Sequence, residues 1–122
     1  MPSAVRALRG ATTIDADQPE HLSERVQTLV NEMLERNGVD KEDLISILFT
    51  ATDDIRSMFP ATAARAVGLG DVPLMCAREL AVDSGTPLCI RVMMHLVTER
   101  SRRELHHVYL EGARQLRDDL PA

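Results

Sequence analysis

The segment Leu88–Val97, with the sequence LCIRVMMHLV, limits the possible folds of this chain more than any other. Successive side chains of a β-strand point to opposite faces, so a strand here has one face that is wholly aliphatic. The second face is also largely apolar, but it carries Arg91. An arginine is always charged and costs several kcal/mol to bury alone, so this strand needs a core on one side and a partner for Arg91 on the other. The first face consists of Leu88, Ile90, Val92, Met94 and Leu96, and the second of Cys89, Arg91, Met93, His95 and Val97.

Two hypotheses for the partner of Arg91 follow from this pattern. In the first, Arg91 forms an ion pair with a carboxylate across a sheet or subunit interface. In the second, it binds an anionic substrate in a partly apolar pocket, a role that suits a planar and permanently charged guanidinium. The pattern by itself favours the ion pair.

A helix is predicted between Asp17 and Gly38. We expect Asp17 to be its N-cap, Pro19 and Glu20 to lie in its first turn, and Gly38 to follow its C-cap. Apolar residues recur at a spacing of about 3.6, which predicts a helix that packs on the outside of a sheet. These residues are Leu22, Val26, Leu29, Val30, Met33 and Leu34.

Two further strands and a short helix are predicted before residue 71. The first strand spans Ser3–Ile14, and the second spans Leu44–Thr52. We expect the second to be buried on both faces, because its apolar run is nearly continuous. A short helix is predicted to start near Pro60 and to end at Gly68 or Gly70.

The segment that begins at Val72 is ambiguous. It starts like a strand, but Cys76 and Glu79 have opposite parity and would face opposite sides of a regular strand. One helical turn after the strand would bring these i, i+3 positions together. Further along the chain, Leu105–Leu110 predicts a short strand, and Glu111–Leu120 predicts a short helix or an irregular tail.

Together these elements predict one α+β domain over residues 1–122, with a mixed β-sheet and helices on the outside. Aromatic residues make up only 2% of the chain, so the core must consist of Leu, Val, Ile, Ala and Met. Helices would cover one face of such a sheet. We expect the other face to be covered by further copies of the chain in a homo-oligomer.

Composition argues against several classes of protein. A net charge of −5 argues against a nucleic-acid partner. No apolar run approaches the ~18–20 residues of a membrane span, and charged residues near the N-terminus do not match a signal peptide. Cys76 and Cys89 lie in apolar surroundings without the spacing of a metal site. Two unpaired thiols suit a reducing compartment, so we expect a cytoplasmic protein without a membrane partner.

Candidate catalytic residues have ordinary structural explanations when they are considered singly. Glu79 suits a surface carboxylate, Cys76 a small buried apolar residue, and Tyr109 a core position. The adjacent His106 and His107 would face opposite sides of a strand, which indicates surface or interface positions. The spacing supports no Ser/His/Asp or Cys/His arrangement for nucleophilic catalysis.

Five blocks of sequence occur in order across nearly the whole chain: RALRGATT, FPATAAR, VPLMCARE, CIRVMM and HVYLEGARQLR. Together they resemble the monofunctional, trimeric α/β-barrel type of chorismate mutase, which is distinct from the all-helical type. The resemblance implies a homotrimeric pseudo-α/β barrel with helices outside and active sites between neighbouring subunits. It also implies the conversion of chorismate into prephenate, on the route to phenylalanine and tyrosine, without a cofactor or metal.

The resemblance further implies roles for individual residues. Arg91 would donate to the ether oxygen of the substrate, which makes the substrate its partner instead of a carboxylate of the protein. Glu79 and the Cys76 region would hold the substrate hydroxyl, while Arg9 and Tyr109 would bind a carboxylate. The implied catalytic residues are Arg9, Cys76, Glu79 and Arg91, and the further substrate-binding residues are Phe59, Ala61, Arg65, Leu74, Met75, Ala77, Arg78, Tyr109 and Leu116, with Arg65 near the mouth.

The chain departs from the family pattern at Thr62, where a lysine is common, and in its short tail after Leu116. Two other functions are alternatives for a chain with this pattern. A non-catalytic trimeric binding protein for a small anionic metabolite would keep the fold and the anion pocket. A trimeric hydrolase or deaminase acting on small imines or amides would need a group that activates water, and none is evident. The joint presence of both arginines, the glutamate and the tyrosine named above favours the mutase.

Overall fold

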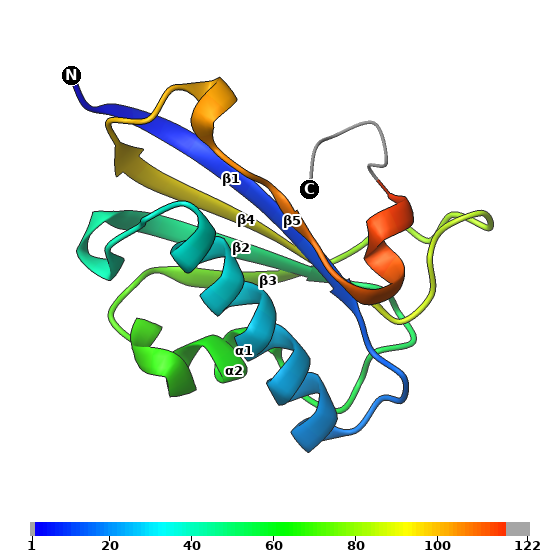
Figure 1. The fold of residues 1–122 in the computed structure, drawn as a ribbon. Coiled ribbons are helices and arrows are strands. Elements are labelled where there is room, and N and C mark those ends of the chain that lie inside the picture. The colour runs from blue at the N-terminus through cyan, green and yellow to red at the C-terminus, as the bar shows by residue number, and fades with distance from the viewer. Residues whose placement is uncertain (1, 117–122) are drawn as a thin grey trace.

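The computed structural model describes residues 2–116, which form a five-stranded mixed sheet with helices on one face (Figure 1). The spatial order of the strands is β3-β2-β4-β1-β5. The central strand β4 is antiparallel to both β1 and β2, while β3 runs parallel to β2 and β5 runs parallel to β1. The predicted mixed sheet is therefore confirmed. The strands are β1 (Ala4–Thr13), β2 (Leu44–Ala51), β3 (Leu74–Arg78), β4 (Cys89–Thr98) and β5 (Val108–Tyr109).

The helices α1 (Pro19–Arg36) and α2 (Pro60–Ala64) lie against the same face of the sheet (Figure 1). A π-helical turn, Arg65–Leu69, continues α2. The predicted tail after β5 is a 3-10 helix over Glu111–Gln115, and its remainder from 117 onward lies outside the described residues. Two further 3-10 turns span Lys41–Asp43 and Arg102–Glu104. Among the described helices, none is long and apolar enough to cross a membrane.

The start of α1 differs from the prediction. Its N-cap is Gln18, whose side chain makes no capping hydrogen bond, and Pro19 occupies the first turn as expected. The predicted cap, Asp17, instead accepts hydrogen bonds from the backbone N–H groups of Arg56 at 2.7 Å and Ser57 at 3.2 Å. A tertiary contact to the loop before α2 thus replaces the local cap.

The end of α1 agrees with the prediction. Gly38 has a φ of +58°, a left-handed conformation that favours glycine. The N–H of Val39 donates to the carbonyl of Leu34 at 2.9 Å, and the N–H of Gly38 donates to that of Glu35 at 3.3 Å, which closes the helix. All six apolar residues of the predicted stripe are buried.

Gly10 permits α1 to lie close to β1. A Cβ atom at this position would lie 2.4 Å from Sδ of Met33 and 3.2 Å from Leu29. The helix therefore approaches the backbone of β1 closely at this glycine. In this way the sequence of β1 fixes how tightly the helical layer packs on the sheet.

The core lies between the helices and one face of the sheet. Ile90, Val92, Met94 and Leu96 of β4 are buried there, as the alternation predicts. The expectation that β2 is buried on both faces is wrong for the chain by itself, because the helices cover only one side of the sheet. Leu48, on the uncovered side, is 36% exposed.

We call this uncovered side the open face. By alternation and register it presents the odd-numbered side chains of β1 and β4 and the even-numbered ones of β2 from Ser46 onward, because the register shifts between Leu44 and Ser46. Several of its apolar side chains are exposed, with Val5 at 62%. Its main members are Val5, Ala7, Arg9, Ser46, Leu48, Thr50, Met75, Arg91, Met93, His95 and Val97.

Candidate active site

A hollow of about 260 Å³ in the open face brings together four of the predicted site residues. Arg9 comes from β1, Arg91 from β4, Tyr109 from β5, and Glu79 from the chain just after β3. The pairing of the strands explains the convergence, because β4 lies between β1 and β2 in the sheet. We call this the Arg91 hollow, and its remaining lining residues are Gly10, Ala11, Leu48, Thr50, Val92 and Met93.

Arg91 has a partner within the protein. Its Nε lies 3.1 Å from Oε2 of Glu79, and the same oxygen accepts a hydrogen bond from Oγ1 of Thr50 at 2.7 Å. The implied expectation that no carboxylate of the protein pairs with Arg91 is therefore wrong, and the ion pair across the sheet is confirmed. The pair uses Nε alone. Among the described residues, no group is bonded to the two Nη atoms of Arg91, which leaves them available to a ligand.

Glu79 reaches Arg91 by an extended chain, and the predicted helical turn after the strand is wrong. Its N–H donates to the carbonyl of Ala51 at 2.9 Å, which continues the pairing of β3 with β2. The alternation of β3 therefore runs on to Glu79 and places it on the open face with Met75 and Ala77. The side chain of Cys76 points to the opposite side and packs against the core.

A second hollow, of about 580 Å³, lies beside the loop before α2. We call it the Phe59 hollow, and it also includes Cys76, Ala77 and Arg78. These residues are thus not brought together with Arg91 in one chain. The remaining implied residues are dispersed. Ala61 is buried in the core, Leu74 and Leu116 are half-buried, and Arg65 and Met75 are exposed.

A third hollow, of about 450 Å³, is lined by the loop between β3 and β4 and by Thr52–Asp54. It shares Glu79 and Arg91 with the Arg91 hollow. The ion pair consequently borders both hollows. This arrangement leaves room around the guanidinium for a small anionic molecule.

Comparison with known proteins identifies the family. A family model described as chorismate mutase type I matches residues 5–120. This chain belongs to that family. Chorismate mutase AroH of Thermus thermophilus is 43% identical over 117 residues, which cover 95% of this chain and 96% of the relative. Chorismate mutase AroH of Bacillus subtilis is 38% identical over 117 residues, which cover 95% and 92%.

A solved structure supports the same assignment. Chorismate mutase from Clostridium thermocellum has a TM-score of 0.88 and 43% sequence identity, covering 90% of this chain and 98% of that chain. The protein is therefore a chorismate mutase, which is an isomerase, and its α+β pseudo-barrel fold is confirmed. The comparisons do not support the alternative of a non-catalytic binding protein.

The third hollow of this chorismate mutase is lined by the thiol of Cys89, which favours its neutral form. Burial raises the pKa of Cys89, which lies two residues before Arg91. The positive charge of Arg91 opposes this shift, while the nearby carboxylates add to it. Cys89 is therefore unsuited to act as a nucleophile. Within residues 2–116, no group of three or more His, Cys, Asp or Glu residues is arranged to hold a metal ion.

Two residues that support the Arg91 hollow have no predicted role in the sequence. Thr50 bonds to Glu79 and lies opposite Arg91 in the register, and its only sequence signal is a hydroxyl within an apolar strand. His107 was predicted to be a surface or interface residue, but its Nδ1 accepts a hydrogen bond from the backbone N–H of Arg9 at 2.9 Å. The one feature of the sequence that points to His107 is its position two residues before Tyr109.

Proposed function

We propose that the Arg91 hollow is the place where this chorismate mutase rearranges chorismate to prephenate. The observation that carries the proposal is the Arg91–Glu79 pair, in the same hollow as Arg9 and Tyr109. The [3,3] shift needs no nucleophile, acid or base. The enzyme has only to hold a compact, chair-like conformer and to stabilise charge as the C–O bond breaks.

Arg91 provides the main electrostatic stabilisation. Negative charge grows on the ether oxygen of the substrate, and the Nη groups of Arg91 donate to it. The bond from Nε to Glu79 fixes the plane of the guanidinium in advance, so little reorganisation accompanies the reaction. Charge-assisted hydrogen bonds of this kind are stronger than neutral ones.

The other residues of the Arg91 hollow orient the substrate. Oε1 of Glu79 accepts the hydrogen bond of the substrate hydroxyl, since its Oε2 is already used by Thr50 and Arg91. The carboxylate also balances the partly positive ring. Arg9 and Tyr109 bind one carboxylate of the substrate.

We propose that the active form is a homotrimer, with each site formed between two subunits. Two observations support this. The implied substrate-binding residues are divided between the Arg91 hollow and the Phe59 hollow of one chain. In addition, Arg9 and Arg91 are opposed by Glu79, so the Arg91 hollow offers one net positive charge to a substrate with two carboxylates. The neighbouring copy supplies Phe59, Ala61, Arg65, Leu74, Met75, Cys76, Ala77 and Arg78, and Leu116 completes the cleft.

We further propose a single domain over residues 1–122 and a cytoplasmic location. The two free cysteines support a reducing compartment. The shikimate route to aromatic amino acids supplies the substrate in this proposal.

One assay tests the proposed site. Purified protein is mixed with chorismate, its ultraviolet absorbance is followed, and prephenate is identified directly. We expect turnover by the natural chain and strongly reduced turnover by Arg91→Ala. A rate equal to that of the spontaneous reaction for the natural chain would contradict the proposed function. A sizing measurement that gives a stable monomer would contradict the intersubunit site.

A further inference from the structure

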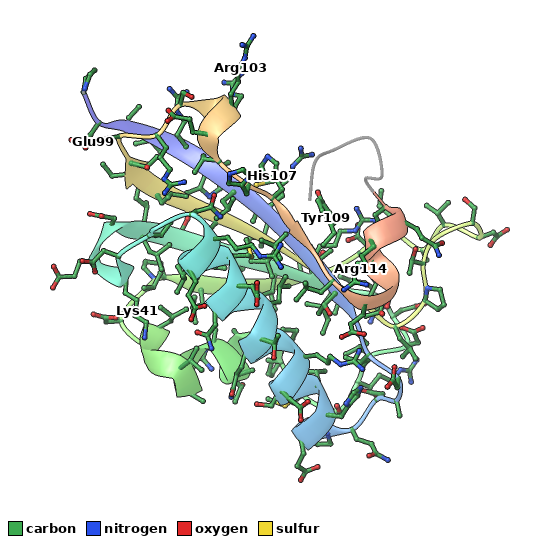
Figure 2. The ribbon with its side chains drawn as sticks, viewed as in Figure 1. Lys41, Glu99, Arg103, His107, Tyr109 and Arg114 are labelled. Carbon is green, nitrogen blue, oxygen red and sulfur yellow. The ribbon has the colours of Figure 1, made fainter. Side chains whose placement is uncertain are left out.

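We propose that His107 is a positioning residue that sets the spacing between Arg9 and Tyr109. This inference rests on the proposed function, in which those two residues bind a substrate carboxylate. The backbone N–H of Arg9 donates to Nδ1 of His107 at 2.9 Å, across 98 positions of the sequence. Figure 2 shows His107 and then Tyr109 along the segment beside β1. One side chain thus connects the strand that bears Arg9 to the segment that bears Tyr109.

The attachment of β5 to β1 is slight, which gives this bond its importance. β5 contains only two residues, and their partners in the register are Gly10 and Ala11. After β5, the N–H of Leu110 donates to the carbonyl of Ala11 at 2.9 Å. Before β5, the ring of His107 provides a hydrogen bond to β1. Tyr109 is therefore held between two anchors, and the His107 ring is the first of them.

The ring replaces a backbone acceptor. Arg9 lies one residue before Gly10, where the pairing of β1 with β5 begins. At Arg9 the backbone N–H donates to a side-chain atom of His107 instead of to a strand carbonyl. Nδ1 of His107 accepts only when it carries no proton, so the proton of the neutral ring resides on Nε2. The spacing between Arg9 and β5 then depends on an atom at a fixed reach from Cβ. An asparagine Oδ1 lies at the same number of bonds from Cβ, whereas a glutamine Oε1 lies one bond farther.

The neighbouring residue anchors this part of the chain independently. The N–H of His106 donates to Oδ1 of Asn37 at 2.6 Å, and Nδ2 of Asn37 donates to the carbonyl of His106 at 2.9 Å. Asn37 is itself buried at the end of α1. Removal of the His107 ring leaves these bonds in place, so we expect the effect to be confined to Arg9 and β5.

Steady-state kinetics of four full-length variants tests the inference. His107→Leu removes the acceptor, His107→Asn keeps it at the same reach, and His107→Gln moves it outward. His106→Leu is the control, because its side chain is exposed and has no described hydrogen bond. The substrate carboxylate is bound equally before and during the reaction, so its misplacement should raise KM more than it lowers kcat.

We expect His107→Leu and His107→Gln to raise the KM for chorismate about tenfold, with kcat within about threefold of the natural chain. His107→Asn should restore KM, and His106→Leu should leave it unchanged. If His107→Leu does not fold, the KM values of His107→Asn and His107→Gln are compared instead. Equal KM values for these two variants would overturn the inference. An unchanged KM in His107→Leu would also overturn it, while turnover by the natural chain would leave the proposed function standing.

Discussion

The guanidinium of Arg91 is oriented before any substrate arrives, because its Nε is already paired with Glu79. Alternation along the strand predicted which face of the sheet Arg91 occupies. It could not predict the partner, since Glu79 follows β3, two strands away from β4 in the sheet. Only the spatial order of strands brings the two residues together, and this order is not written in the local pattern of either strand.

Arg91→Ala should lower kcat by at least about 10²–10³-fold, the usual loss for one preorganised donor. Arg91→Lys should also be poor, because a single ammonium cannot bond to Glu79 and to the substrate with the same planar geometry. The kcat of each variant is measured from initial rates of chorismate loss at saturating substrate. A near-normal kcat for Arg91→Ala would exclude the proposed role.

The thiol of Cys89 should react slowly with thiol reagents while the protein is folded. Cys89 is buried and its pKa is raised by that burial, so at pH 8 it holds less thiolate than an ordinary cysteine. Labelling with iodoacetamide in the Cys76→Ala variant isolates Cys89. We expect slow labelling of the folded variant that quickens as pH rises, and rapid labelling after unfolding. Equal rates in the folded and unfolded states would contradict this expectation.

Among the elements, α1 and β4 were predicted well because each has a long stretch with a clear period. The errors arose where a distant segment outweighs the local signal. Asp17 is a residue type that commonly caps helices, but two N–H groups about 40 residues away donate hydrogen bonds to its carboxylate. Similarly, the chain after β3 stays extended because Glu79 pairs with Ala51. A continuous apolar run such as β2 also does not reveal which of its faces the helices cover.

The contact from Asp17 to the loop before α2 should make stability depend on pH. The neighbouring Ser57 hydroxyl, the backbone N–H groups of Arg56 and Ser57, and the charge of Arg56 lower the pKa of Asp17, although burial opposes this shift. A lowered pKa in the folded state contributes stability above the ordinary carboxyl pKa, and this contribution is lost as pH falls through the folded-state pKa.

Asp17→Ala should therefore lower Tm at pH 7 by about 2–4 °C, the shift that corresponds to a modest loss of stability in a chain of this size. The difference from the natural chain should shrink as the pH approaches the folded-state pKa of the carboxyl. Thermal unfolding followed by circular dichroism from pH 7 to pH 3 provides the measurement. A Tm difference that stays constant over this range would contradict the assigned contact.

For the whole molecule, the main consequence of the fold is the uncovered side of the sheet. The sequence predicted that a partner would be needed there, since an aromatic-poor chain with two apolar strand faces cannot cover both with two helices. The open face does expose Val5 and Leu48 in the single chain. How the copies are arranged depends on shape across the whole surface, which strand periodicity does not encode.

Val5→Glu should weaken the proposed trimer, because it places a charge among the apolar side chains of the open face. Thr28→Glu, on an exposed position of α1, is the matched control. We expect sizing with light scattering to give a trimer for the natural chain and the control, and smaller species with reduced kcat for Val5→Glu. A fully active monomer in either case would contradict the intersubunit site.

The separation of the Arg91 hollow from the Phe59 hollow has a genetic consequence in such a trimer. A substitution in one hollow leaves the other hollow of the same polypeptide unchanged. Consider two inactive alleles, one altered at Arg91 and one altered in the Phe59 hollow. Their products would assemble mixed trimers in which some clefts combine an unaltered Arg91 hollow with an unaltered Phe59 hollow. Cells carrying both alleles would regain growth without added phenylalanine and tyrosine, whereas cells carrying either allele alone would not.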